Sequence, residues 1–206
     1  IGSTATDLLN ADVFQYARTQ STGNDLVLTF TQSGLDQSLT LSNWMSSANT
    51  SATGTNFVHT FVTSDGVSFN LTMGNSATAF NYAGSTITDL IYGSTANDSL
   101  NGGSDTLVDA IYGGAGNDTI IYHAQDIING GNDTDWVTAT TATSGVMIDL
   151  TGSVASTNIT NVENLLGSSL ADTLIGTTGT NILQGAGGAD LLYGAAGGND
   201  TLQGGA

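Results

Sequence analysis

The chain has 206 residues and a formal charge of −17, with 18 acidic side chains, one basic side chain, no cysteine and no proline. A charge of this sign repels nucleic acid and anionic membranes, and a chain without cysteine forms neither disulfides nor thiolate metal sites. No apolar run approaches the roughly 18 residues of a membrane span. We therefore expect no nucleic acid partner and no membrane insertion, and cations are the natural partner.

Residues 1–10 form a partial repeat. Gly2 stands first in it, Asp7 sixth and Leu9 eighth, and residues 204–206 begin the same pattern again. Unfinished ends of this kind predict one of two situations. Either the chain stacks end to end on a second copy, or it is an excerpt of a longer chain whose neighbours supply the missing repeats.

Residues 11–83 alternate apolar and polar side chains with the period of a β-strand. The pattern places Leu26, Leu28 and Phe30 on one face, and Leu39 and Leu41 on the matching face of a hairpin partner. The stretch FVHTFVTSDGVSFNLTM repeats this arrangement, with SDG as the turn. We expect a small antiparallel β segment here.

Residues 84–138 contain a repeat of nine residues that begins with Gly and carries Asp sixth and an aliphatic residue eighth. The regular copies are GSTITDLIY (84–92), GSTANDSLN (93–101), GGAGNDTII (113–121) and GGNDTDWVT (130–138). Between them, 102–112 is longer and 122–129 is shorter. We align the longer copy on Asp109 and Ile111, although Asp105 and Leu107 fit almost as well.

Residues 167–206 form a second block of the same kind. Its copies are GSSLADTLI (167–175), GTTGTNILQ (176–184), GAGGADLLY (185–193) and GAAGGNDTLQ (194–203). Between the blocks, residues 139–166 are rich in Thr and poor in Asp, so we expect a connection that continues the stack without metal.

The period predicts short loops that alternate with very short strands. Six residues rich in Gly, Asn and Asp suit tight turns, and three residues with a central aliphatic form a strand. Strands this short are stable only when stacked, so the fold is predicted to be all-β, with two parallel sheets around a thin core. The eighth-position residues of the first block fill that core: Ile91, Leu100, Ile111, Ile120, Ile128 and Val137.

Each repeat makes half a coil, so acidic side chains of alternate repeats meet on the same edge. The predicted pairs are Asp89–Asp109, Asp109–Asp126, Asp98–Asp118, Asp118–Asp135, Asp172–Asp190 and Asn181–Asp200. Such ladders repel unless a cation lies between them. A hard divalent ion with many oxygen ligands fits best, and Ca²⁺ suits this site better than Mg²⁺ or zinc.

These repeats closely resemble the RTX, or hemolysin-type, calcium-binding nonapeptide family, written G-G-x-G-x-D-x-U-x. The resemblance covers 84–138 and 167–205, and it implies a parallel β-roll that binds several Ca²⁺ ions. The predicted ligands are the carboxylates of the repeats and glycine carbonyls of the best copies: Asp7, Asp89, Asp98, Asp109, Asp118, Asp126, Asp135, Asp172, Asp190, Asp200, Gly113, Gly114, Gly116, Gly130 and Gly131.

Several copies depart from the family pattern. Asn181 replaces Asp, Ala or Ser often replaces the second Gly, and 122–129 has no Gly in its loop. We expect the sites at these copies to be weak or empty. Segments of 11–83 and the run ITNVENLLGSSLADTLIG are also similar to stretches that accompany RTX repeats in large exported proteins, adhesins and surface-layer proteins.

Residues with catalytic potential are few. His59 and His123 belong to no catalytic motif, and Glu163 is interpreted as a loop or strand-end residue. The aromatic residues fit sheet positions, although a row of tyrosines could bind sugars. They are Trp44, Trp136, Tyr92, Tyr112 and Tyr193. We therefore expect no enzyme activity.

The predicted function is a calcium-dependent extracellular building block of a surface layer, fibre or adhesin. It would self-associate end to end or in a lattice, and cell-surface polysaccharide is a possible further partner. The family resemblance implies type I secretion to the outside or the surface of a Gram-negative bacterium. The alternative is the repeat region of an exported toxin, protease or lipase whose catalytic domain lies elsewhere.

Overall fold

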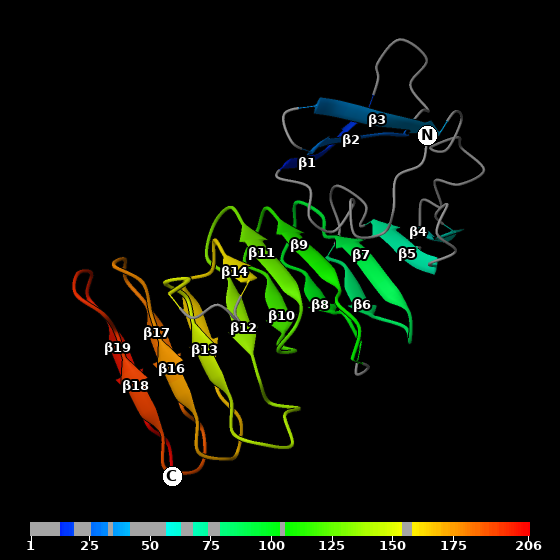
Figure 1. The fold of residues 1–206 in the computed structure, drawn as a ribbon. Helices are drawn as coiled ribbons and strands as arrows, with labels where there is room; N and C mark the ends of the chain where they lie inside the picture. Colours follow the sequence, from blue (N-terminus) through cyan, green and yellow to red (C-terminus); the bar gives the residue numbers. More distant parts are fainter. Residues whose placement is uncertain are drawn as a thin grey trace.

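The computed structural model describes residues 79–103, 106–153 and 158–206 with their side chains, together with the backbone of five earlier strands. All elements in this part of the chain are β-strands (Figure 1). It contains no helix long and apolar enough to cross a membrane. The predicted all-β fold class is confirmed.

The first three strands form an antiparallel sheet. They are β1 (Val13–Arg18), β2 (Leu26–Gln32) and β3 (Leu35–Leu41). Leu26 pairs with Leu41 and Leu28 with Leu39 in the backbone register, as the alternating pattern predicted. Register here follows from the period of two, since a slip of one residue would reverse the two faces.

A second hairpin joins the solenoid that follows it. β4 (Phe57–Val62) and β5 (Ser68–Met73) pair in antiparallel fashion, as predicted, while the SDG turn lies outside the described residues. β5 then pairs in parallel with β7, so this hairpin extends one sheet of the solenoid. No local pattern in the sequence predicts this continuity.

One long parallel sheet runs through the whole solenoid (Figure 1). We call it the long sheet. Its strands are β6 (Asn81–Ala83), β8 (Ser99–Asn101), β10 (Thr119–Ile121), β12 (Trp136–Thr138), β15 (Asn164–Leu166), β17 (Ile182–Gln184) and β19 (Thr201–Gln203).

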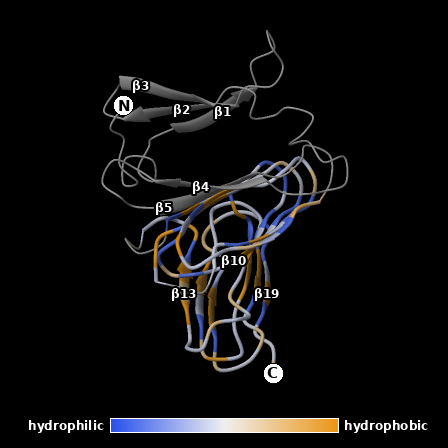
Figure 2. Cartoon of the chain, turned by 90° about the vertical axis from the view of Figure 1, so that its right-hand side faces the viewer, coloured by the Kyte–Doolittle hydropathy of each residue, from blue (hydrophilic) through white to orange (hydrophobic). Residues whose placement is uncertain are grey.

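The opposite face consists of two shorter sheets. The first partner sheet contains β4 and β5 followed by β7 (Thr88–Tyr92), β9 (Ala110–Gly114), β11 (Ile127–Gly131) and β14 (Asn158–Thr160). The second partner sheet contains β13 (Met147–Asp149), β16 (Thr173–Ile175) and β18 (Leu191–Tyr193). Viewed along the stack, successive coils lie one behind another (Figure 2).

The Asp-poor connection is where one partner sheet gives way to the other. Between β12 and β15 the chain forms β13, which begins the second partner sheet, and β14, which ends the first. β15 then pairs with β12 in the long sheet. The connection therefore continues the stack, although the opposite face passes from one partner sheet to the other.

A single file of aliphatic side chains fills the space between the sheets. All six predicted core residues of the first block have no solvent exposure, and Ile148, Leu165, Leu174 and Leu183 continue the file. Ile111 is buried whereas Leu107 is 45% exposed, which confirms the alignment of the long copy. Each buried aliphatic side chain contributes about 1.5–3 kcal/mol, so this thin core needs support from the loops.

Candidate metal sites

The loops lie on two edges of the solenoid. We call the loops that enter long-sheet strands the long-sheet edge, and those that enter partner-sheet strands the partner-sheet edge. The sixth-position Asp residues on both edges lie directly before a strand, except Asp89, which lies within β7. All of them are buried except Asp190 and Asp200, which are partly exposed. Buried carboxylates need hydrogen-bond donors or a cation.

One carboxylate oxygen of each such Asp other than Asp89 receives a backbone N–H from the coil before it. The Asp98 N–H donates to Asp118 Oδ1 at 2.8 Å, and the Asp118 N–H donates to Asp135 Oδ1 at 2.8 Å. All six predicted pairs meet in this way. The ladder is thus built from N–H to carboxylate bonds, which offset part of the repulsion expected from charge alone.

The first glycine of a loop borders a small cradle of oxygen atoms. A Cβ built on Gly113 would lie 2.2 Å from the Gly130 carbonyl oxygen and 2.3 Å from Asp118 Oδ2. A Cβ on Gly130 would lie 2.1 Å from the Asn161 carbonyl oxygen and 2.5 Å from Asp135 Oδ2. Carboxylate and carbonyl oxygens from two stacked loops therefore face the same point.

The second carboxylate oxygen has no hydrogen-bond donor in four loops. Oδ2 of Asp118, Asp126, Asp135 and Asp190 is buried and has no hydrogen-bond partner. Asp118 and Asp135 are 0% exposed. Calcium prefers carboxylate and carbonyl oxygens, so these residues fit a bound Ca²⁺ ion.

Burial changes the acidity of these two carboxyl groups. Burial raises the pKa of Asp118 to about 7, against the effect of the Asp98 N–H, and the charges of Asp135, Asp98 and Asp133 add to the rise. Burial also raises the pKa of Asp135 to about 6, with smaller increases from Glu163 and Asp133 and an opposing effect of the Asp118 N–H. Without a cation, the protein environment disfavours the two negative charges.

The other predicted glycine ligands have different surroundings. Gly114, Gly116 and Gly131 have φ values of 109°, 101° and 112°, a region that L side chains rarely adopt. The Gly114 carbonyl already accepts the Asn132 N–H at 2.9 Å. Gly116 donates its N–H to Asp133 Oδ2 at 3.1 Å. Gly113 and Gly130 thus border cradles, whereas Gly114 and Gly116 shape the loops.

Some of the predicted carboxylates have hydrogen-bond donors on both oxygens. In Asp89, Asp98 and Asp172, both oxygens accept hydrogen bonds from described residues, and a serine supplies several of them. Asp109 Oδ1 accepts the Asp89 N–H at 2.7 Å. Asp7 lies outside the described residues.

Asp126 and Asp200 occupy less regular loops. Asp126 Oδ2 lies 3.3 Å from His123 Nδ1, so an imidazole stands beside this carboxylate in the loop that has no glycine. Asp200 accepts the Asn181 N–H at 2.9 Å and is partly exposed. Among the described residues, no three His, Cys, Asp or Glu side chains converge on one point.

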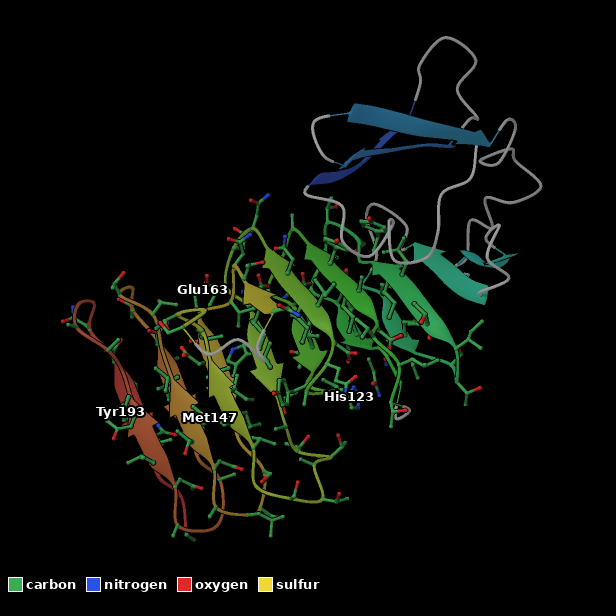
Figure 3. The ribbon with its side chains drawn as sticks, in the orientation of Figure 1. His123, Met147, Glu163 and Tyr193 are labelled. Carbon is green, nitrogen blue, oxygen red and sulfur yellow. The ribbon has the colours of Figure 1, made fainter. Side chains whose placement is uncertain are left out.

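Glu163 belongs to the acidic ladder, which the sequence analysis missed. Its Oε2 accepts the Asp135 N–H at 2.9 Å, and its carbonyl accepts Asn181 Nδ2–H at 2.7 Å. It stands directly before β15 on the long-sheet edge (Figure 3). The spacing contained the signal, because Glu163 precedes the buried Leu165 by two residues, as each Asp precedes its aliphatic partner.

A second ladder of polar side chains follows the loop tips. Asn97 Oδ1 accepts the Asn117 N–H at 2.8 Å, and Asn117 Oδ1 accepts the Thr134 N–H at 3.0 Å. Asp133, with φ of 74°, accepts the Gly116 N–H. The fifth-position Asn of a repeat thus links stacked loops outside the acidic ladder.

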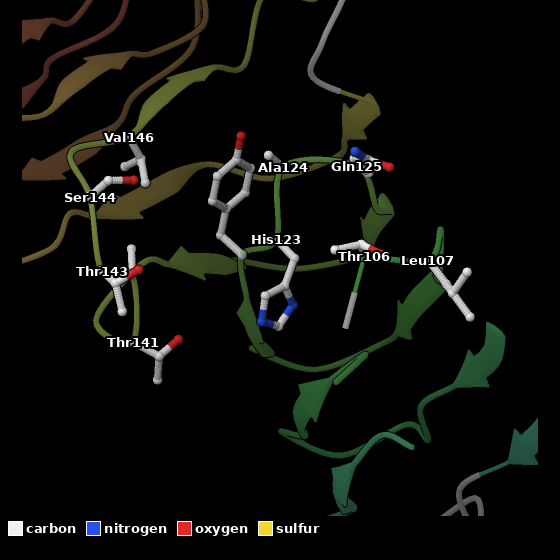
Figure 4. Close-up of a pocket in the computed structure, with 11 residues that line it drawn as sticks. Thr106, Leu107, His123, Ala124, Gln125, Thr141, Thr143, Ser144 and Val146 are labelled. Carbon is white, nitrogen blue, oxygen red and sulfur yellow. The ribbon is translucent and has the colours of Figure 1, made fainter. Parts of the chain in front are cut away.

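A cavity of about 410 Å³ lies beside the short loop that contains His123 (Figure 4). Tyr122, Thr106, Thr141 and Val146 line it together with His123. The cavity arises where the short repeat and the Thr-rich connection leave the regular stack. His123 is paired with the buried carboxylate of Asp126 here, and its neighbours in the cavity are hydroxyl groups, apolar groups and the Gln125 amide.

Stacked parallel coils with carboxylate and carbonyl oxygens between their loops define a calcium-binding β-roll. The family model of the RTX calcium-binding nonapeptide repeat matches the chain in four copies, at 84–120, 108–126, 166–198 and 195–206. The repeats of this chain are therefore RTX repeats, and they bind several Ca²⁺ ions. A search of curated proteins found no significant match.

The family match defines a structural fold and indicates no catalytic family. RTX repeats are typical of proteins that Gram-negative bacteria export by type I secretion.

Proposed function

We propose that this chain is an extracellular structural protein that folds and assembles when calcium fills the sites between its coils. It would serve as a building block of a surface layer, fibre or adhesin rather than as an enzyme. The buried, unpartnered Oδ2 atoms of Asp118 and Asp135 carry this proposal. A buried carboxylate oxygen without a donor is costly, and a bound cation removes that cost.

Calcium binding would couple directly to folding. Extracellular calcium modules commonly bind in the range of about 10⁻⁴ to 10⁻³ M, so their sites are empty inside a cell and filled outside it. In low calcium the ladder charges oppose stacking of the coils, and the chain stays loose enough for export. Outside, the binding free energy becomes folding free energy.

The long sheet also offers a place for a surface sugar. A shallow groove of about 520 Å³ on its outer face is lined by Trp136, Thr119, Thr138 and Gln184. An indole face beside hydroxyl and amide groups suits a sugar ring. We propose cell-surface polysaccharide as a secondary partner of this groove.

Circular dichroism and sedimentation test the main proposal. The purified chain is expected to lose most of its β signal in excess EGTA and to regain it in millimolar Ca²⁺, with Mg²⁺ as the control ion. In Ca²⁺ it is expected to form ordered polymers as its concentration rises. An unchanged β signal in EGTA overturns the calcium coupling. A calcium-folded monomer at high concentration overturns assembly and favours the repeat region of an exported toxin, protease or lipase.

A further inference from the structure

Neighbouring loops on the long-sheet edge differ at their second residue. Loop 93–98 has Ser94 in this position and loop 113–118 has Gly114. Both loops begin with a glycine and end with a buried Asp, and both first glycines border a carbonyl oxygen and Oδ2 of that Asp. The cradle is therefore common to the two loops, and the difference lies in what else reaches the carboxylate.

Ser94 satisfies the carboxylate of Asp98 from within the loop. Its backbone N–H donates to Asp98 Oδ2, and its hydroxyl donates to Asp98 Oδ1 at 2.9 Å. The Phe80 N–H donates to Asp98 Oδ1 as well, at 2.6 Å. Ser94 Oγ also accepts the Ala96 N–H at 3.0 Å, which fixes the turn. Every oxygen of Asp98 is engaged without a metal.

The same closure recurs in three other loops. The N–H of Ser85 donates to Asp89 Oδ2 at 2.7 Å, and its hydroxyl donates to the same oxygen at 3.0 Å. Ser168 donates its N–H to Asp172 Oδ2 at 2.6 Å and its hydroxyl to Asp172 Oδ1 at 3.0 Å.

The fourth loop of this kind ends in an amide instead of a carboxylate. The Thr177 N–H donates to Asn181 Oδ1 at 2.8 Å. Asn181 carries no charge, so this loop has even less need of a cation.

Three loops with Gly or Ala in the second position, 113–118, 130–135 and 185–190, lack these donors. Gly114, Gly131 and Ala186 have φ values of 109°, 112° and 74°. Their backbone is therefore in the left-handed region, which the serines of the closed loops do not adopt. Oδ2 of Asp118, Asp135 and Asp190 is then left buried and unpartnered. Ala186 resembles the glycines here rather than the serines, although the sequence grouped Ala with Ser as a weakening substitution.

We infer that the second residue of each loop decides whether the loop takes a calcium ion. Loops with Ser or Thr in this position are closed by their own amide and hydroxyl and hold no ion, whereas loops 113–118, 130–135 and 185–190 are open and hold one. This inference rests on the proposed calcium-dependent function and divides its sites into two classes.

The two classes have an ordered arrangement along the chain. Closed loops 84–89 and 93–98 form the first coil of the first block, and closed loops 167–172 and 176–181 form the first coil of the second block. Open loops follow in each block. Each block therefore begins with a coil that needs no metal, on which the calcium-dependent coils stack.

Counting bound ions in serine variants tests the inference. Ser94→Gly removes the hydroxyl and frees the backbone to take a positive φ, which opens the existing cradle of Gly93, Asp98 Oδ2 and the Gly113 carbonyl. Equilibrium dialysis of the full chain against radioactive Ca²⁺ is expected to give one more bound ion than in the wild type. Ser168→Gly is expected to add one ion in the same way, at Asp172.

Two control variants are available in the same loops. Ser94→Thr keeps the hydroxyl, as Thr177 does naturally, and Ser169→Gly places a new glycine at an exposed neighbour of Ser168. Both are expected to bind the wild-type number of ions. If neither Ser94→Gly nor Ser168→Gly gains an ion while the wild type binds calcium, the inference is wrong and the proposed function stands. If the wild type binds no calcium, the proposed function fails with it.

Discussion

Loops 93–98 and 113–118 both bury a carboxylate, but they differ in what interacts with its second oxygen. Each buries an Asp whose Oδ1 receives a main-chain N–H from the preceding coil, and each starts with a glycine pressed against the next loop. In the first loop, Ser94 satisfies the remaining oxygen. In the second, that oxygen is bare. One residue thus determines whether the protein itself or a cation satisfies a buried charge.

The largest loss of stability is expected from a substitution at the first glycine of a loop, a residue that loops 93–98 and 113–118 share. Gly113→Ala would place a methyl group 2.2 Å from the Gly130 carbonyl and 2.3 Å from Asp118 Oδ2, so the stacked loops must separate. We expect the free energy of unfolding in Ca²⁺ to fall by about 3 kcal/mol and one ion to be lost. Denaturant melts and ion counts measure both.

Gly204→Ala is the control for this change, because nothing lies within 4 Å of its added Cβ. It is expected to change the free energy of unfolding by less than about 0.5 kcal/mol. Equal stability of Gly113→Ala and Gly204→Ala would contradict the tight contact between the loops.

Replacing a buried Asp by Asn removes the charge of the carboxylate but keeps a hydrogen-bond acceptor. Asp118→Asn keeps the acceptor for the Asp98 N–H but removes the open carboxylate, so one ion is lost. The calcium-dependent stabilisation should fall by up to about 2.7 kcal/mol at a calcium concentration near 100 times the dissociation constant. In EGTA the variant should be more stable than the wild type, since a buried charge is gone.

Asp98→Asn is the matched substitution in the closed loop, where Asn181 shows that an amide is accommodated. It is expected to leave the ion count unchanged. A loss of one ion in Asp98→Asn, measured by the same dialysis, would show that serine-closed loops also bind calcium.

The pH dependence should differ with and without calcium. Burial raises the pKa of Asp118 to about 7 and of Asp135 to about 6, from 3.8. Between about pH 4 and about pH 7, the calcium-free fold binds more protons than the unfolded chain, so its stability falls as the pH rises. Calcium needs the ionised carboxylates, so its affinity should increase over the upper part of this window.

Thermal melts in EGTA and calcium titrations between about pH 5 and about pH 8 measure these two trends. Asp118→Asn is expected to flatten both. A stability in EGTA that rises with pH, or a calcium affinity that falls with pH, would contradict the raised pKa values of Asp118 and Asp135.

The smallest effect is expected from the closing hydroxyl alone. Ser168→Ala removes the bonds from Ser168 Oγ to Asp172 and the acceptor for the Leu170 N–H, but the residue keeps its main-chain N–H to Asp172 Oδ2. We expect a loss of about 1 kcal/mol in the free energy of unfolding in EGTA. Ser169→Ala, next to it and exposed, should melt like the wild type.

The repeat spacing determined the architecture of the solenoid. A Gly-rich loop followed by a three-residue strand leaves the chain few alternative folds. The buried residues from Ile91 to Val137 and the acidic pairs were therefore predicted from the sixth and eighth positions of each repeat. The choice of Asp109 and Ile111 over Asp105 and Leu107 needed the structure. Both alignments fit the spacing, and only packing shows that Leu107 is exposed.

Tertiary structure decided what each acidic residue does. Glu163 takes a place in the ladder because β15 stacks on β12, a contact across the Asp-poor connection that no local pattern specifies. Whether an Oδ2 is open depends on the sign of φ at the second loop residue and on donors that only the folded loop brings within reach. Repeat spacing is a local property of the chain, so it predicted where the acidic residues stand. The folded coils determined which charges are already neutralised, because hydrogen bonds depend on distances in space.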